Sequence, residues 1–231
     1  MSELTTKEFN EIYKRNFREY FDKPLKKDGF YKKGTINFYR LNKLGMVEVL
    51  NFQRWYDKLT VNCSIKPIFC ASTKSSTEVG KRLGKFMNTR NDYWWDVKDD
   101  ESMKKSMQEM LKVIRKDLYE WFNKMDNEKE ILEYISKSYQ TIIYRYITQA
   151  ASMAKFRRYK EILQYIEKVK KEYIEGWTKE EREEREWLKK VLDEALLLEE
   201  KIKEGKESID KYIEEREKQS IIELGLKKLI K

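Results

Sequence analysis

The densest cluster of acidic side chains lies just ahead of a predicted helix and comprises Asp92, Asp96, Asp99, Asp100 and Glu101. Carboxylates at this spacing can hold Mg²⁺ and so support phosphoryl chemistry. The same pattern is typical of a solvated loop that leads into a helix, because helix N-termini favour acidic residues. We favour the loop and helix cap. A metal-dependent hydrolase is therefore the third function considered, and we predict no metal and no cofactor.

A basic segment with interleaved aromatic residues runs from position 144 to position 160. Its candidate contacts for nucleic acid are Arg145, Lys155, Arg157, Arg158 and Lys160. Phosphate contacts combined with aromatic stacking would use this composition. On a helix, however, these positions spread around the axis, and the neighbouring alanines indicate close helix packing. A nucleic-acid-binding accessory protein is therefore the alternative function.

Polar and aromatic residues on predicted strands provide a third candidate site, made of Gln53, Trp55, Trp94 and Trp95. Tryptophan is prominent in protein interfaces, so these residues are the candidate contacts for a partner. Asn51, Gln53 and Arg54 could instead make hydrogen bonds that hold the sheet together, which we favour for these polar groups. If 93–95 form a strand, one of the two adjacent tryptophans points inward.

Several kinds of catalytic site lack their residues. The chain has no histidine, which removes the commonest general base and the Ser-His and Cys-His pairs. Cys63 and Cys70 are too few for a zinc site or a disulfide framework, and we predict buried thiols in a reducing cytosol. No phosphate-binding glycine loop or Gly-x-Ser-x-Gly turn is present. We predict no catalytic residue.

Composition indicates a folded protein. The chain has 231 residues, of which 39% are charged and 40% hydrophobic, with 13% aromatic, so material for a core is ample. The formal net charge is +9, and most of the basic excess lies before residue 131, where it is diffuse and forms no block. No apolar run approaches the roughly 20 residues of a membrane span, and no export signal is seen at the start. We expect a cytoplasmic protein with no membrane partner.

The hydrophobic periodicity of the sequence separates predicted helices from predicted strands, and these elements would position the candidate residues. Thr5-Thr-Lys-Glu8 is a capping box that predicts a helix as far as Asp28-Gly29, with a break near Pro24. From Gly34 the period becomes two, and three strands follow up to about residue 65, with 46–55 as the central one. A short fourth strand is possible at 93–95. An antiparallel meander is the simplest topology.

From Asp99 onward the pattern is almost wholly helical. A first helix carries an apolar stripe from Met103 to Phe122. Further helices are predicted at about 128–149, 153–175, 178–203 and 206–229, with a second capping box at Thr178-Lys-Glu-Glu181. The predicted fold class is α+β, with an N-terminal helix on a three- to four-stranded antiparallel sheet and a helical C-terminal half. The predicted domains are 1–127 and 128–231.

A series of short motifs resembles one bacterial family, catalogued as domain of unknown function 4304. The motifs are Leu25-Lys-Lys-Asp-Gly-Phe30, Asn37-Phe-Tyr-Arg40, Leu50-Asn-Phe-Gln-Arg54, Val61-Asn62, Arg82-Leu-Gly84 and Trp94-Trp95. The resemblance covers about residues 5–135 and implies an α+β domain from a bacterial cytoplasm. The family has no assigned catalytic residues. Small domains of this kind often lie near toxin-immunity and phage-defence loci, which is an argument by analogy alone.

The leading functional prediction is a non-enzymatic module that binds another protein, plausibly an immunity-like or phage-defence accessory protein. Its partner would contact the sheet edge, the Trp94-Trp95 region or the C-terminal helices. This prediction depends on the missing catalytic motifs and on the family resemblance.

Overall fold

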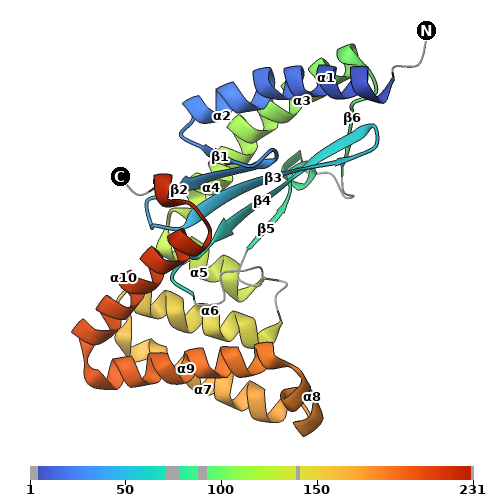
Figure 1. Cartoon of the computed structure of the whole chain (residues 1–231). Helices are drawn as coiled ribbons and strands as arrows, with labels where there is room; N and C mark the ends of the chain where they lie inside the picture. Colours follow the sequence, from blue (N-terminus) through green and yellow to red (C-terminus); the bar gives the residue numbers. More distant parts are fainter. Residues whose placement is uncertain (1–4, 71–78, 88–92, 139–140, 230–231) are drawn as a thin grey trace. The chain divides into compact units, whose positions relative to one another are not determined.

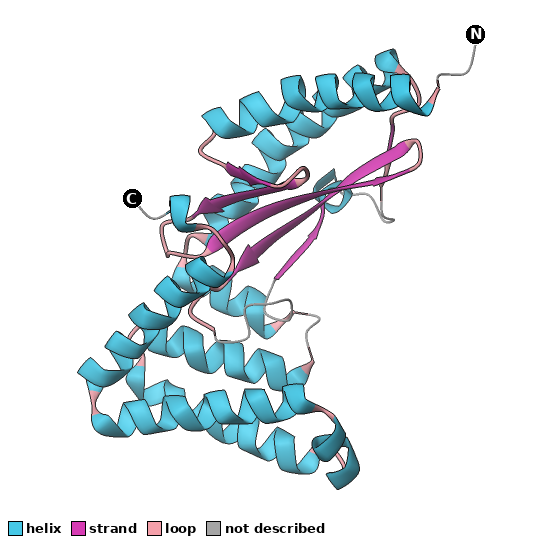
Figure 2. Ribbon diagram, in the orientation of Figure 1, coloured by secondary structure: helices cyan, strands magenta, loops and turns pink. Residues whose placement is uncertain are grey.

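The computed structural model describes residues 5–70, 79–87, 93–138 and 141–229 (Figure 1). The chain forms two compact units. Unit 1 comprises Met1–Asn42, Val47–Ile65 and Gly80–Met125, and unit 2 comprises Lys43–Met46, Lys66–Val79 and Asp126–Lys231. Strands belong to the first unit, whereas the second is mainly helical (Figure 2).

The N-terminal helix begins at the predicted capping box. Thr5 Oγ1 accepts a hydrogen bond from the Glu8 N–H, and Glu8 Oε2 accepts one from the Thr5 N–H. The helix consists of α1 (Thr6–Phe17), the π-helical stretch η1 (Arg18–Asp22) and α2 (Lys23–Lys27). The π-helical stretch lies next to Pro24, which has no N–H to donate to the carbonyl four residues earlier. The helix is therefore continuous past Pro24, and the irregularity next to the proline is this π-helical stretch.

The motif Leu25–Phe30 is the C-terminal cap of this helix. Gly29 has a φ of +88°, a left-handed conformation that glycine adopts without strain. The Gly29 N–H donates to the Lys26 carbonyl at 3.2 Å, and the Phe30 N–H donates to the Leu25 carbonyl at 2.9 Å. This pair of bonds is a Schellman motif, which ends the helix and directs the chain into the first strand.

Among the residues that the structure describes, the sheet has six strands, more than the three or four predicted. They are β1 (Tyr31–Lys33), β2 (Asn37–Leu41), β3 (Val47–Trp55), β4 (Lys58–Lys66), β5 (Val79–Arg82) and β6 (Trp95–Asp96). The order is β1-β2-β3-β4-β5, and β6 pairs with the start of β4. The additional strands, β1 and β5, are short edge strands, whose few residues produce little alternation in the sequence. The predicted antiparallel α+β class is confirmed.

Helices cover one face of the sheet. Figure 1 shows α1 side by side with α3 (Asp100–Val113) over this face. The core between them contains aromatic rings from the helix and the strands: Phe17 packs on Phe52 at 5.0 Å between centroids, and Phe21 packs on the same ring at 4.4 Å. Phe38 of β2 adds a contact at 5.5 Å. Burial of these four rings, each under 5% exposed, anchors the first helix to the sheet.

Asp28 connects the first helix to the second. Its carboxylate accepts hydrogen bonds from both Nε and Nη2 of Arg115, at 3.0 and 3.1 Å, and from Tyr119 Oη at 2.8 Å. The Arg40 guanidinium lies over the rings of Phe30 and Tyr119 and donates to the Asp28 carbonyl. Arg115 belongs to the π-helical stretch η3 (Ile114–Leu118) and Tyr119 begins α4 (Tyr119–Met125). The helix-ending motif therefore also positions the second helix.

Unit 2 is built from helices whose bounds are α5 (Glu128–Ser136), α6 (Ile142–Lys155), α7 (Tyr159–Glu175), α8 (Lys179–Glu184), α9 (Glu186–Glu204), α10 (Lys206–Glu223) and the short 3₁₀ helix η4 (Lys227–Leu229). Helix α6 packs along α7, and α9 contacts α6, α7 and α10. Ala150, Ala151 and Ala154 of α6 are buried, which lets a neighbouring helix approach closely, as predicted.

Several predicted helix boundaries are wrong. The segment 128–149 is two helices, and the break predicted after residue 149 does not occur, because α6 continues to Lys155. Within α6 the Ser152 hydroxyl donates to the Thr148 carbonyl at 2.6 Å, so these polar residues are accommodated in the helix. Arg157, with a φ of +56°, ends it. Thr178 caps α8 as predicted, and α8 then ends before Arg185.

None of the helices that the structure describes is long and apolar enough to span a lipid bilayer.

Candidate functional site

Large aromatic side chains are exposed at the tip of the β3–β4 hairpin. Trp55 ends β3 and is 66% exposed, and Tyr56 in the turn is 81% exposed. Tyr56 has a φ of +50°, which follows from the tight two-residue connection between the strands. Most of both side chains therefore contacts solvent, although each is an apolar group whose burial would be favourable.

The second part of this surface comes from the segment that ends in β6. Trp95 pairs with Leu59 and is 1% exposed, so its side chain belongs to the core. Trp94 is half-buried and lies edge-on to Trp55, at 6.4 Å between ring centroids. The inference that one of the two tryptophans points inward therefore identifies Trp95. We leave Trp95 out of the candidate surface for this reason.

A glycine lets this segment approach the rest of the sheet. Gly84 lies in the 3₁₀ helix η2 (Leu83–Met87), and a Cβ added to it would be 2.5 Å from the Cβ of Tyr93. No side chain fits there, which explains on steric grounds why the Arg82-Leu-Gly84 motif has glycine at its last position. The close contact places Tyr93 next to η2 and thereby positions Trp94.

Charges of both signs surround the aromatic rings. The Arg82 guanidinium lies 5.1 Å from the Trp94 ring centroid. Lys58 Nζ forms an ion pair with Asp96 Oδ1 at 2.8 Å, and Lys98 lies 3.8 Å from the same oxygen. The hydrogen bond from Lys58 lowers the pKa of the Asp96 carboxyl and raises that of the Lys58 ammonium. Both groups are therefore charged at neutral pH.

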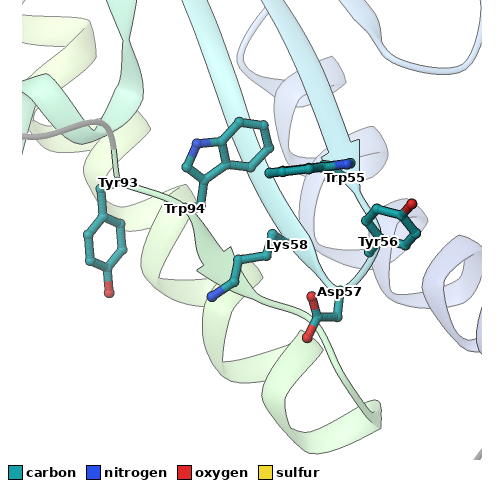
Figure 3. Close-up of a pocket in the computed structure, with 6 residues that line it drawn as sticks. All are labelled: Trp55, Tyr56, Asp57, Lys58, Tyr93 and Trp94. Atoms are coloured by element: carbon teal, nitrogen blue, oxygen red, sulfur yellow. The ribbon is translucent and has the colours of Figure 1, made fainter.

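The hairpin tip and residues 93–94 line an open hollow of about 620 Å³ (Figure 3). Its lining, which we call the Trp55–Trp94 surface, consists of Trp55, Tyr56, Asp57, Lys58, Tyr93 and Trp94. Figure 3 shows the two indole rings close together on one side of the hollow and Asp57 at the turn. The arrangement provides flat apolar rings with charged groups at their edges, and it contains no nucleophile paired with a base.

Polar residues of the strands lead away from this surface on the same face. Asn51 Nδ2 donates to Asn37 Oδ1 at 2.7 Å, and Asn62 Nδ2 donates to Asn51 Oδ1 at 3.2 Å. This asparagine ladder joins β2, β3 and β4. Gln53 is half-buried and lies between Asn51 and Trp55 in β3. The ladder agrees with the favoured structural role of the strand amides.

The acidic residues before α3 have separate partners. Asp99 caps the helix by accepting from the Ser102 N–H at 2.7 Å, and Asp100 binds Arg15 and Lys104, each at 2.8 Å. Asp92 lies outside the described residues. In the part of the chain that the structure describes, no three His, Cys, Asp or Glu side chains could hold a metal ion together. The helix-cap interpretation of this cluster is confirmed for Asp99.

The basic segment of unit 2 is largely paired with acidic residues. Lys155 forms an ion pair with Glu217, Arg157 with Asp210, and Arg158 with Glu161 and Glu128. Arg145 Nη1 donates to the Ser136 carbonyl at 3.4 Å. Lys160 is exposed. The structure therefore does not collect these cations on one free surface.

The cysteines are free and buried, as predicted. Cys63 lies in unit 1 and Cys70 in unit 2. Burial raises the pKa of both thiols, so they are protonated and unreactive at neutral pH.

Sequence reasoning missed Tyr56, Asp57, Lys58 and Tyr93 as members of the Trp55–Trp94 surface, and it missed Arg82 beside it. Tyr56, Asp57 and Lys58 have a signal in the sequence, because the short connection between two predicted strands must expose its residues. Arg82 and Tyr93 have none, since their position depends on the packing around Gly84.

The described residues and this surface define an α+β domain in which helices cover one face of an antiparallel sheet. Residues 21–124 match the model of the family described as Domain of unknown function (DUF4304). The match confirms the resemblance predicted from the sequence over these residues, and it includes the whole Trp55–Trp94 surface. Searches among curated proteins and among solved structures found no match.

Proposed function

We propose that this protein is a non-enzymatic interaction module that binds another protein through the Trp55–Trp94 surface. The observation that carries the proposal is the exposure of Trp55 and Tyr56, at 66% and 81%, at the hairpin tip beside Trp94. Tryptophan, tyrosine and arginine dominate the binding energy of protein interfaces, and Arg82 stacks on this same cluster. Burying these rings against a partner would remove apolar surface from water, which is favourable for binding.

The charges favour a protein over a nucleic acid. A polyanion requires a basic surface, whereas Asp57 lines the hollow and Asp96 neutralises Lys58 at its edge. An aromatic centre with a rim of both signs is the usual anatomy of a protein interface. Nucleic-acid binding by the basic segment has less support, since its cations Lys155, Arg157 and Arg158 are paired within unit 2.

The biological setting belongs to the proposal as well. An immunity-like or phage-defence role in a bacterial cytoplasm is supported by the family resemblance and by the absence of a catalytic constellation among the described residues. Both are arguments from analogy and from missing chemistry. A partner toxin or phage protein would give this role direct support.

The test compares partner capture by three forms of the tagged protein in its native host. The double variant Trp55→Ala/Tyr56→Ala removes the two most exposed rings. The control, Ile174→Ala, removes a side chain of similar exposure, 63%, from helix α7 of unit 2. Each capture is performed with and without nuclease and read by mass spectrometry, and the captured partner is then titrated against the purified proteins.

We expect the wild type and the control to retain a stoichiometric partner after nuclease, and the double variant to lose it. In titration the double variant should bind at least about 30-fold more weakly, because hot-spot residues contribute 2 kcal/mol or more. Unchanged affinity of the double variant would exclude this surface. Loss of all partners on nuclease treatment would instead favour the nucleic-acid alternative.

A further inference from the structure

A groove separate from the Trp55–Trp94 surface lies between α1 and the strands β1 to β3 of unit 1. Its volume is about 480 Å³, within the range of small-molecule sites. The residues that line it, here called the α1–β3 groove, are Asn10, Tyr13, Lys14, Phe17, Arg18, Asp22, Lys32, Thr35, Ile36 and Arg54. The proposal below is independent of the function proposed above.

The groove carries an excess of positive charge. Asp22 is its one carboxylate and is paired with Lys32, whose Nζ lies 2.7 and 2.8 Å from the two carboxylate oxygens. The remaining cations are Lys14, Arg18 and Arg54. Within the described ranges, none of these three has a carboxylate partner. The groove is therefore lined by three uncompensated positive charges.

Two of these cations have an unfavourable spacing along the helix. Lys14 and Arg18 are four residues apart along the helix, on the same side, where like charges repel. Both are exposed, so water weakens the repulsion without removing it. An anion bound between them would convert the repulsion into two attractive contacts.

Aromatic rings form the apolar part of the groove. Tyr13 and Phe17 lie 5.6 Å apart between ring centroids, and the Arg54 guanidinium is 4.9 Å from the Tyr13 centroid. Arg54 Nη1 also donates to Asn10 Oδ1 at 3.1 Å, which holds the guanidinium over the groove. Phe17 is 4% exposed and Lys32 Nζ lies 5.1 Å from its ring centroid, so a flat ring in the groove would pack against Tyr13.

The Tyr13 hydroxyl can form a further hydrogen bond. Among the residues that the structure describes, it has no hydrogen-bond partner, although the ring is mostly covered. Burial raises the pKa of Tyr13 to about 12, so the hydroxyl keeps its proton and can donate. A ligand oxygen in the groove would accept that hydrogen bond.

We propose that the α1–β3 groove binds a small organic phosphate in which a phosphate group is attached to or near a flat ring. The phosphate, with a charge close to −2 at neutral pH, matches the cations Lys14, Arg18 and Arg54 better than a single carboxylate does. The ring packs on Tyr13, and the Tyr13 hydroxyl donates to the ligand. The groove thus offers cations for the phosphate group and an aromatic side chain for the ring of one molecule.

The test uses three probes with the full-length protein: phenyl phosphate, inorganic phosphate and phenol. Binding of each is measured by calorimetry at low salt. The variants are Arg54→Gln, Arg18→Gln and Tyr13→Phe, which keeps the ring and removes the hydroxyl. The control is Lys105→Gln, which removes the same charge from an exposed position of α3 outside the groove. Circular dichroism verifies that every variant is folded.

We expect phenyl phosphate to bind more tightly than either fragment. Arg54→Gln and Arg18→Gln should each weaken binding at least about tenfold, as expected when a hydrogen bond to a charged group is lost. Tyr13→Phe should weaken it about fivefold, and Lys105→Gln should leave it within about twofold.

Other outcomes would overturn the proposal. These are no saturable binding of phenyl phosphate up to about 1 mM, or binding that the groove variants do not change. Equal affinity for inorganic phosphate would remove the aromatic half of the proposed ligand. If an acidic peptide such as hexaglutamate displaced phenyl phosphate at lower concentration, the groove would be a protein contact and no small-molecule site.

Discussion

Arg54 and Trp55 are neighbours in β3 and serve opposite faces of the sheet. The Arg54 guanidinium lies 4.9 Å from the Tyr13 ring on the helix-covered face, whereas Trp55 faces Trp94 at 6.4 Å on the other. Successive side chains of a strand alternate between faces, so one short segment contributes to both the α1–β3 groove and the Trp55–Trp94 surface. The two proposed sites can therefore be changed separately by mutation.

Trp55 and Trp95 should differ sharply in their effect on stability. Because Trp55 is mostly exposed, Trp55→Ala should change the free energy of unfolding by no more than about 0.5 kcal/mol. Trp95 is buried, so Trp95→Ala should cost about 3–5 kcal/mol. Urea denaturation of both variants measures the difference. Similar losses for the two would mean that Trp55 is packed in solution.

Gly84 should tolerate no side chain. In Gly84→Ala the new methyl group would meet Tyr93, so we expect a loss of about 1–3 kcal/mol and altered tryptophan fluorescence as Trp94 moves. Gly34→Ala is the control, because it has a φ of +67° but open space around the added Cβ. It should cost about 1 kcal/mol through backbone strain and leave the fluorescence unchanged. Normal fluorescence in Gly84→Ala would contradict the steric argument.

The ion pair between Arg40 and Glu48 should be needed for stability, because Glu48 is buried. Arg40 Nε donates to Glu48 Oε2 at 2.6 Å, and the Glu48 side chain is 3% exposed. Arg40→Leu should therefore destabilise the protein by about 3 kcal/mol, since it removes the guanidinium from a buried carboxylate. The double variant Arg40→Leu/Glu48→Leu should recover more than half of this loss in thermal denaturation. A double variant no more stable than the single one would refute this account.

Replacing Arg157 with glycine should stabilise the protein. Its φ of +56° is strained for a residue with a Cβ, and its side chain is 69% exposed in the ion pair with Asp210. Arg157→Gly should raise the free energy of unfolding by about 0.5–1 kcal/mol, because relief of strain exceeds the loss of an ion pair whose cation is exposed. Arg157→Ala, which loses the pair but keeps the strain, should be slightly less stable than wild type. Chemical denaturation ranks the three proteins, and the reverse order would disprove the strain.

Because of the Asp100 carboxylate, the free energy of unfolding should depend on pH in the acidic range. Hydrogen bonds from Lys104, Asn16 and Arg15 lower its pKa from 3.8 to about 2. Its contribution is therefore complete above pH 3.8 and is lost as the pH falls toward 2. Solvent screens this half-exposed group, so Asp100→Asn should cost only about 1 kcal/mol at pH 7. The difference from wild type should shrink toward pH 2 in urea titrations, and a constant difference would contradict the assignment.

Local signals in the sequence were sufficient where short-range chemistry decides the structure. The capping boxes at Thr5 and Thr178 and the glycine cap at Gly29 are formed as predicted, because each depends on bonds between residues close in sequence. The strand β4 was also predictable from its alternation, and β3 from its more apolar run. By contrast, β1 and β5 are short edge strands, and their pairing depends on residues elsewhere in the chain.

The sites divide in the same way. The sequence alone excluded histidine chemistry and predicted an α+β domain with a helical C-terminal half. It also predicted that Trp55 and one of two adjacent tryptophans are candidate contacts for a partner. Only the tertiary structure decided that this tryptophan is Trp94, that Arg82 and Tyr93 join it, and that Arg54 turns to a groove beside Tyr13. The physical reason is that helix caps and strand alternation are set by near neighbours, whereas a surface is assembled from segments that only packing brings together.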